Sequence, residues 1–138
     1  MPKTDHLSEG GVKLVQEPQL AHFATVSSSG VPQVTPVWVD VEADGSHILI
    51  NTAAQGRLKK RNIEENPQVA VSVVDAKNPW RYVTVQGTVV ELRSEGARDH
   101  INFLAKKYVG ADLYTFGPPD EERVIIRIQP HHVLEQGV

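Results

Sequence analysis

The sequence contains no cysteine among its 138 residues, which excludes disulfide bonds and thiolate sites for metals or redox chemistry. It also lacks any apolar run close to the roughly 20 residues of a membrane-spanning helix, and its first residues lack the apolar core of a signal peptide. We therefore expect a cytoplasmic protein with no membrane partner. Any redox chemistry must come from a bound cofactor.

The chain also has little net charge. Its 14 Lys and Arg residues are balanced by 17 Asp and Glu, for a formal charge of -3. This balance is too mild to indicate a nucleic-acid partner, so phosphate binding would need a local cationic patch. With 40% hydrophobic residues, the length suffices for one sizeable core and not for two. We expect a single domain over residues 1–138.

Most of the chain has the two-residue period of β-strands, in runs separated by Gly, Asp, Ser and Pro. The first three runs form an expected meander joined by SSSG and ADG, and the last three are rich in Val and Ile. Pro36 marks an edge, a bulge or a ligand-facing position in the second run, and Gly87 marks a bulge. The six expected strands cover residues 22–27, 32–42, 47–52, 68–75, 81–92 and 123–128.

Three short segments have helical character. Residues 7–17 have loosely helical apolar spacing, residues 56–66 are mostly charged around Leu58 and Ile63, and residues 94–108 have a regular helical pattern. Six strands with so few helices favour a closed antiparallel barrel over a parallel sheet.

The segment NTAAQGRLKKRN, residues 51–62, has the clearest chemical character. A strand ends, Gly56 permits a turn, and four cations lie within five residues at the start of a helix. Exposed N–H groups and the helix dipole favour an anion there, which Arg57 and Lys59 would contact. The alternative is a solvated basic helix face in which Lys60 pairs with Glu64.

The basic segment and the strands around it resemble a known family. The run ILINTAAQGRLKKRNIEENPQVAVSVVD, followed by RYVTVQGTVVEL, is similar to the pyridoxamine-phosphate-oxidase-like flavoproteins. The stretch from Phe23 to Val133 resembles their flavin and deazaflavin oxidoreductase branch, described as coenzyme F420-dependent enzymes. The resemblance implies a mainly β, six-stranded antiparallel split β-barrel with short flanking helices, which forms a homodimer with cofactor sites at the subunit interface.

The resemblance also implies site residues. Thr52, Arg57 and Lys59 match positions that bind the cofactor phosphate, the strand segment from Val34 to Val37 lies along the ring system, and the RY pair reaches the cofactor from the partner subunit. The predicted cofactor-binding residues are Val34, Thr35, Pro36, Val37, Asn51, Thr52, Arg57, Lys59, Lys60, Arg81 and Tyr82.

Two departures from the family pattern argue against a vitamin-B6 oxidase. The pyridoxamine phosphate oxidases begin their second strand with an Arg, where this chain has Val34. They also have a C-terminal segment that completes the substrate-phosphate site, whereas this sequence ends in IQPHHVLEQGV. The substrate is a small molecule that no motif identifies.

The expected cofactor is coenzyme F420, with FMN as the alternative. A deazaflavin implies hydride transfer, whereas FMN also permits one-electron and oxygen chemistry, and in both cases the reactive atom belongs to the cofactor. No catalytic side chain is therefore expected. A third alternative is a non-catalytic protein that carries a flavin, a deazaflavin or a tetrapyrrole.

The remaining candidate residues are histidines and aromatics. The adjacent His131 and His132 point to opposite faces of a strand, so we expect no metal site. Trp38 is expected in the core and Trp80 at the lip of a pocket. The loop GADLYTFGPP, residues 110–119, is long enough to act as a lid, or it packs against the partner subunit.

Overall fold

The structure is a computed structural model that describes residues 5–55 and 58–138. A curled antiparallel sheet with three short helices confirms the predicted mainly β split barrel. The elements are α1 (Glu9–Gln16), β1 (Ala21–Val26), β2 (Pro32–Val37), β3 (Asp40–Val41), β4 (Ile48–Ala53), α2 (Leu58–Glu65), β5 (Gln68–Asp75), β6 (Asn78–Arg93), α3 (Ala97–Val109) and β7 (Arg123–Gln136).

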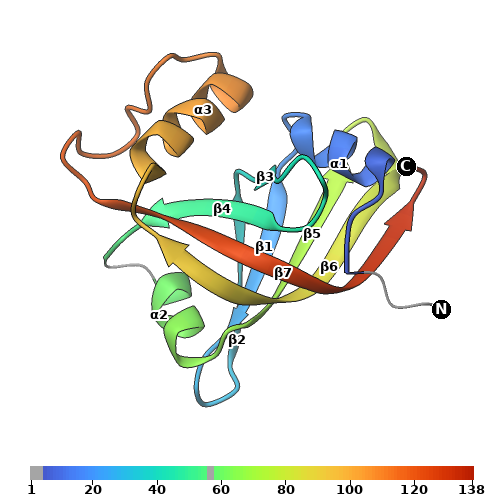
Figure 1. The fold of residues 1–138 in the computed structure, drawn as a ribbon, viewed down its shortest axis with the longest axis horizontal. Helices are drawn as coiled ribbons and strands as arrows, with labels where there is room; N and C mark the ends of the chain where they lie inside the picture. The colour runs from blue at the N-terminus through green and yellow to red at the C-terminus, as the bar shows by residue number, and fades with distance from the viewer. Residues whose placement is uncertain (1–4, 56–57) are drawn as a thin grey trace.

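The strand order explains why the sheet is curled. The strands pair antiparallel in the order β2-β1-β5-β6-β7-β4-β3, so β2 and β3 occupy the two outer edges. Only Trp38 and Val39 join these edges, and three Cα–Cα steps span at most about 11 Å. The sheet must therefore curve until its edges approach each other, which produces the half-barrel in Figure 1.

The prediction of six strands was wrong by one, because the second expected strand is divided into β2 and β3. Both predicted hairpins form, β1 with β2 and β3 with β4, but they do not make a continuous meander because β2 and β3 lie at opposite edges of the sheet. At the division the Val39 N–H donates to the Tyr108 hydroxyl at 3.1 Å, and the Val39 carbonyl accepts from Lys107 Nζ at 2.6 Å. Because α3 supplies hydrogen-bond partners for the backbone N–H and carbonyl of Val39, this residue needs no neighbouring strand. The chain can therefore pass from one edge of the sheet to the other at this point.

Pro36 and Gly87 lie where their backbone properties predict. Pro36 is in β2, an edge strand, where a missing N–H need not interrupt a ladder. In β6 the register with β7 shifts between Gln86 and Gly87. A Cβ at Gly87 would lie 2.5 Å from the Gln129 carbonyl oxygen, so no side chain fits at this bulge.

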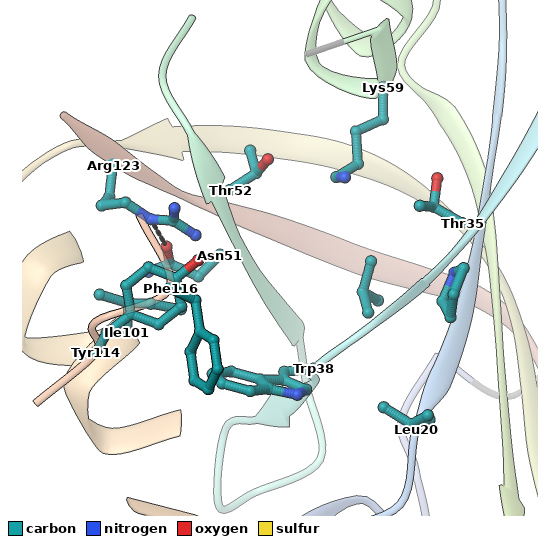
Figure 2. A pocket seen from close by; sticks show the side chains of 12 residues that line it. Leu20, Thr35, Trp38, Asn51, Thr52, Lys59, Ile101, Tyr114, Phe116 and Arg123 are labelled. Carbon is teal, nitrogen blue, oxygen red and sulfur yellow. Dashed lines mark hydrogen bonds between the residues drawn. The ribbon is translucent and has the colours of Figure 1, made fainter. Parts of the chain in front are cut away.

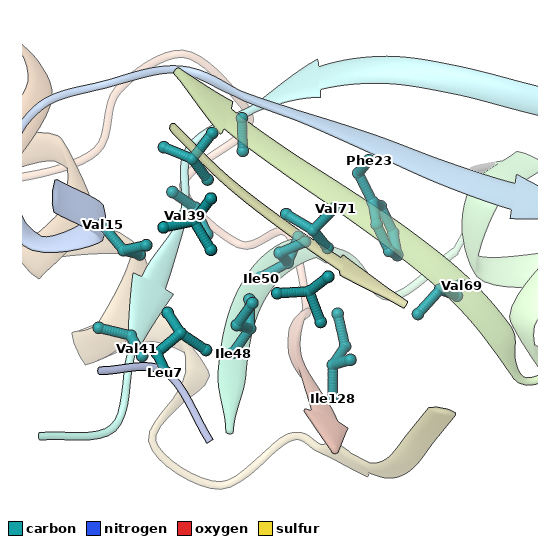
Figure 3. Close-up of a cluster of buried hydrophobic side chains, with 14 of the residues drawn as sticks. Leu7, Val15, Phe23, Val39, Val41, Ile48, Ile50, Val69, Val71 and Ile128 are labelled. Carbon is teal, nitrogen blue, oxygen red and sulfur yellow. The ribbon is translucent and has the colours of Figure 1, made fainter. Parts of the chain in front are cut away.

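The core fills the inside of the curled sheet and extends under α1 (Figure 3). It consists mainly of Val and Ile from alternate strand positions, together with Phe23, which is fully buried in β1. Leu14 and Val15 of α1 belong to the same cluster, and Ser8 caps this helix by accepting from the Gly11 N–H at 3.0 Å. The alternation therefore leaves the opposite face of the sheet to a mixture of polar, small and a few exposed apolar side chains, among them Val34 and Leu134.

The other two helices lie beside the opening of the barrel (Figure 1). In α2, Ile63 is buried and the Asn62 side chain donates to the Thr25 hydroxyl at 3.0 Å, which holds the helix against β1. In α3, Ile101 and Leu104 are buried. None of the helices in the described ranges has the length and apolar character needed to span a membrane.

Candidate functional site

A cavity of about 450 Å³ lies at the opening of the barrel, between the edge strand β2, the strand β4 and the helices α2 and α3 (Figure 2). Each helix contributes one side chain to the lining of the cavity, Lys59 from α2 and Ile101 from α3. Six of the predicted cofactor-binding residues line it: Thr35, Pro36, Val37, Asn51, Thr52 and Lys59. The structure thus brings together, around one cavity, segments that are distant in sequence.

One side of the cavity carries hydroxyl groups and a cation. Lys59 extends from the first turn of α2, and Thr52 and Thr35 face the same space from β4 and β2 (Figure 2). The Thr35 hydroxyl is buried and has no hydrogen-bond partner within the described part of the chain. Because a buried polar group without a partner is costly, this hydroxyl points to a ligand that supplies one.

Asn51 and Arg123 form a buried polar pair at another wall. Arg123 Nε donates to Asn51 Oδ1 at 2.9 Å, and the Asn51 amide nitrogen donates to the Ala97 carbonyl at 2.9 Å. The same nitrogen lies 3.1 Å from His100 Nδ1, and His100 Nε2 lies 3.0 Å from Asp40 Oδ2. This chain of contacts fixes the orientation of the Asn51 amide and therefore the place of the guanidinium.

The third wall is aromatic. The Trp38 ring stacks on Tyr108 with centroids 5.3 Å apart, and it meets Tyr114 and Phe116 edge to face, each at 5.9 Å. Tyr114 also covers the Arg123 guanidinium at 4.9 Å. Phe116 is 66% exposed, so the rim of the cavity presents a large apolar surface to solvent. Such a wall suits a planar, partly apolar ligand.

Two residues of α3 hold the aromatic wall from behind. The Tyr108 hydroxyl donates to the Gln19 carbonyl at 2.6 Å, and burial raises the pKa of this phenol to about 12. Lys107 Nζ donates to the Val15 and Val39 carbonyls, both at 2.6 Å. Burial lowers the pKa of Lys107 to about 8, against the opposing effect of the Asp40 carboxylate.

Two predicted site residues lie away from the cavity, and a third is not described. Lys60 lies 3.2 Å from Glu64 in an i,i+4 ion pair, as the alternative interpretation of the basic segment expected for that residue. Val34 points to the opposite face of β2 and lines a second groove on the outside of the sheet. Arg57 lies outside the described residues.

Arg81 and Tyr82 lie away from the cavity, in the first part of β6. The Arg81 guanidinium pairs with Glu17 at 2.8 Å and with Asp75 at 3.0 Å. Its hydrogen bonds hold the pKa of the Glu17 carboxyl below the ordinary value, and the Lys77 backbone N–H and Arg81 do the same for Asp75. A role toward a partner's cofactor stays a prediction for both residues.

Sequence reasoning missed several cavity residues. Trp38 was expected in the core but lines the cavity, whereas Trp80 is 74% exposed and does not line it. Arg123 was predicted only as the first residue of a strand. Its position before a run of Val and Ile was the one feature of the sequence that could have indicated a site residue. Tyr114 and Phe116 belong to the loop that was predicted to act as a lid or to pack against the partner subunit, and they form the aromatic wall. The lining residues absent from the prediction are Leu20, Trp38, Ile101, Tyr114, Phe116 and Arg123.

No group of three or more His, Asp or Glu side chains that could hold a metal ion occurs within residues 5–55 and 58–138. The curled antiparallel sheet, with a cavity at its open edge, has the architecture of the small split barrels. The chain matches the pyridoxamine 5'-phosphate oxidase family over residues 8–137 and belongs to that family. No curated protein matches the sequence.

Solved structures place the chain near several proteins of this fold. An F420 reductase is 33% identical, with a TM-score of 0.79, over 94% of this chain and 100% of that one. General Stress Protein 26 from Bacillus anthracis is 20% identical, with a TM-score of 0.66, over 92% and 96%. HupZ from Group A Streptococcus is 22% identical, with a TM-score of 0.61, over 89% and 90%. At the two lower identities the likeness concerns the fold alone.

Proposed function

We propose that the protein is an oxidoreductase that binds coenzyme F420 in the central cavity and transfers hydride to a small-molecule acceptor. The family match and the similarity to an F420 reductase support a flavin- or deazaflavin-type oxidoreductase. The observation that carries the proposal is the cavity itself, which places Lys59, two Thr hydroxyls and an aromatic wall around one space.

The cavity residues fit such a cofactor. Lys59 would contact the phosphate, because its charge lies at the start of α2, where backbone N–H groups also favour an anion. The Thr52 hydroxyl lies at the same wall (Figure 2). The Thr35 hydroxyl, which lacks a partner within the described residues, would donate to or accept from the bound ring system. The aromatic wall would exclude water from the ring.

When bound, the deazaflavin supplies the hydride. The protein would contribute orientation, an aromatic wall beside the ring, and positive charge for the phosphate. Asn51 uses both ends of its amide in contacts to Arg123, Ala97 and His100, so its contribution would be to hold the cavity wall. We therefore propose no side chain as a nucleophile or as a general acid.

We further propose a homodimer formed through the outer face of the sheet. The second groove lies on this face, with a volume of about 430 Å³, and its lining residues come from β1, β2, β5, β6 and β7. Val34 and Leu134 are 61% and 39% exposed there, among small side chains such as Ala24 and Ser72. A sheet face with exposed apolar side chains among small ones suits burial against a second copy.

The decisive experiment is a titration of the purified protein with coenzyme F420 and, separately, with FMN, at matched ionic strength, followed by ring fluorescence. Saturable binding of F420 with weaker or no binding of FMN is the expected result. Preference for FMN would replace the cofactor while keeping an oxidoreductase in the same cavity. Binding of neither would overturn the proposal.

Turnover separates the enzyme from a carrier. With reduced cofactor bound, the protein should oxidise it in the presence of at least one member of a panel of enones, quinones and biliverdin. Tight binding without turnover across that panel would instead favour a non-catalytic protein that carries a flavin, a deazaflavin or a tetrapyrrole.

A further inference from the structure

We infer that Arg123 is a specificity-determining residue that donates hydrogen bonds from its Nη2 group to a carbonyl oxygen on a planar, conjugated ligand. The inference deepens the proposed function and rests on it, because it concerns an occupant of the same cavity. It identifies a second recognition point, on a different wall from Lys59 (Figure 2).

The surroundings of Arg123 leave one edge of the guanidinium for a ligand. Its side chain is 5% exposed, Nε donates to Asn51, and Nη1 donates to Glu121 Oε1 at 2.6 Å. The Tyr114 ring covers one face of the group. Nη2 makes no hydrogen bond to any described residue. Nη2 is not among the buried side-chain atoms of the described residues that lack a partner, so it is accessible from the cavity that Arg123 lines, and its N–H groups are available to an acceptor bound there.

The charge balance selects the kind of acceptor. Glu121 offsets the positive charge of Arg123 in a short, mostly buried ion pair. Arg98 donates to the Glu121 carbonyl, which holds that residue in place. A neutralised guanidinium keeps its directional donors but attracts a full anion less strongly. The preferred acceptor is therefore a neutral oxygen, whereas Lys59 remains the position for a phosphate.

The neighbouring aromatic rings select the shape of the ligand. Trp38, Tyr114 and Phe116 surround the same space as the guanidinium, and two of them meet Trp38 edge to face. A planar ring would pack against these faces with its edge toward Arg123. A neutral acceptor on a planar conjugated ring is most simply a carbonyl. That carbonyl could belong to the pyrimidine edge of a flavin-type ring or to the hydride acceptor.

The test compares ligands with and without carbonyls, on protein freed of cofactor, by calorimetric titration. Menadione and 2-methylnaphthalene share a bicyclic skeleton and represent the acceptor, whereas lumichrome and phenazine represent the cofactor ring. Arg123→Lys keeps the cation for Glu121 but loses the planar fork. In the wild type, the carbonyl-bearing member of at least one pair should bind about tenfold more tightly than its reference.

In Arg123→Lys that preference should fall toward unity, while binding of the carbonyl-free reference stays unchanged. Loss in the menadione pair assigns the contact to the acceptor, and loss in the lumichrome pair assigns it to the cofactor ring. A variant that keeps its preference in both pairs, or that weakens all four ligands equally, would overturn the inference, since equal weakening indicates only a structural role.

A second variant keeps Arg123 itself. Glu121→Gln removes the offsetting charge, so it should strengthen binding of 1,4-naphthoquinone-2-sulfonate relative to menadione by about tenfold. An unchanged ratio would contradict the charge argument. The outcomes are distinguishable from failure of the proposed function, because none of these titrations requires coenzyme F420 to bind.

Discussion

Removing the charge of Lys59 should weaken cofactor binding, whereas removing the charge of its neighbour should not. Lys59 lines the cavity from the first turn of α2, and Lys60 is paired with Glu64 at 3.2 Å. Adjacent residues of a helix point about 100° apart, so both cannot face one phosphate equally well. The two alanine variants therefore form a matched pair with the same change of charge in the same turn.

The magnitude follows from the kind of contact. A hydrogen bond to a charged group contributes about 1.5–3 kcal/mol. Lys59→Ala should therefore raise the Kd for coenzyme F420 about tenfold to a hundredfold, and the Kd for FMN similarly if FMN binds. Lys60→Ala removes an exposed i,i+4 pair, which contributes about 0.3–0.5 kcal/mol to the helix, and should change the Kd by less than about threefold.

The assay is fluorescence titration at two ionic strengths, with the unfolding temperature of each variant measured beside it. Salt should weaken cofactor binding to the wild type more than binding to Lys59→Ala, because the variant lacks the charged contact that salt screens. Equal losses in the two variants would indicate a diffuse basic patch. An unchanged Kd in Lys59→Ala would mean that the phosphate binds elsewhere.

Three further predictions test the site, the fold and the assembly. Thr35→Val removes a buried hydroxyl that has no described partner, so it should stabilise the ligand-free protein by about 1 kcal/mol in chemical denaturation yet weaken F420 binding several-fold; a loss of stability, or unchanged binding, would contradict the assigned role. Burial lowers the pKa of Lys107 to about 8 from an ordinary value of 10.5, so the unfolded chain binds more protons between these values and the free energy of unfolding should rise with pH from about 8 to 10.5. That gain, up to about 3 kcal/mol before solvent screening, should be missing in Lys107→Met, and identical pH profiles would refute it. Val34→Glu should convert the proposed dimer to monomers in size-exclusion chromatography with light scattering, while Val31→Glu, at a position that is 62% exposed in the β1–β2 turn, should not; dissociation by both or by neither would count against the outer-face interface.

Local features of the sequence were sufficient to predict most elements. Alternating Val and Ile identified the strands, because a strand with one buried face requires a two-residue period. The loosely spaced Leu14 and Val15 indicated a helix that α1 confirms, and Gly87 marked a bulge in β6. The strand-end Thr52 and the helix-start Lys59 were identified as candidate site residues, and both line the cavity.

The tertiary structure decided which of these features meet. No local pattern shows that the chain leaves one sheet edge at Val37 and joins the opposite edge at Asp40, since this depends on partners that Tyr108 and Lys107 supply from α3. The same crossover turns Trp38 into the cavity instead of the core.

Pairing between segments distant in sequence also decided where two charged residues lie. Arg123 reaches the cavity because β7 pairs with β4 and so places its guanidinium beside Asn51. Arg81 instead meets Glu17, 64 residues away, at the other end of the barrel. The sequence alone determined strand character and predicted a local anion site, because both depend on neighbouring residues. Cavity composition depended on the closure of the sheet, which only long-range pairing specifies.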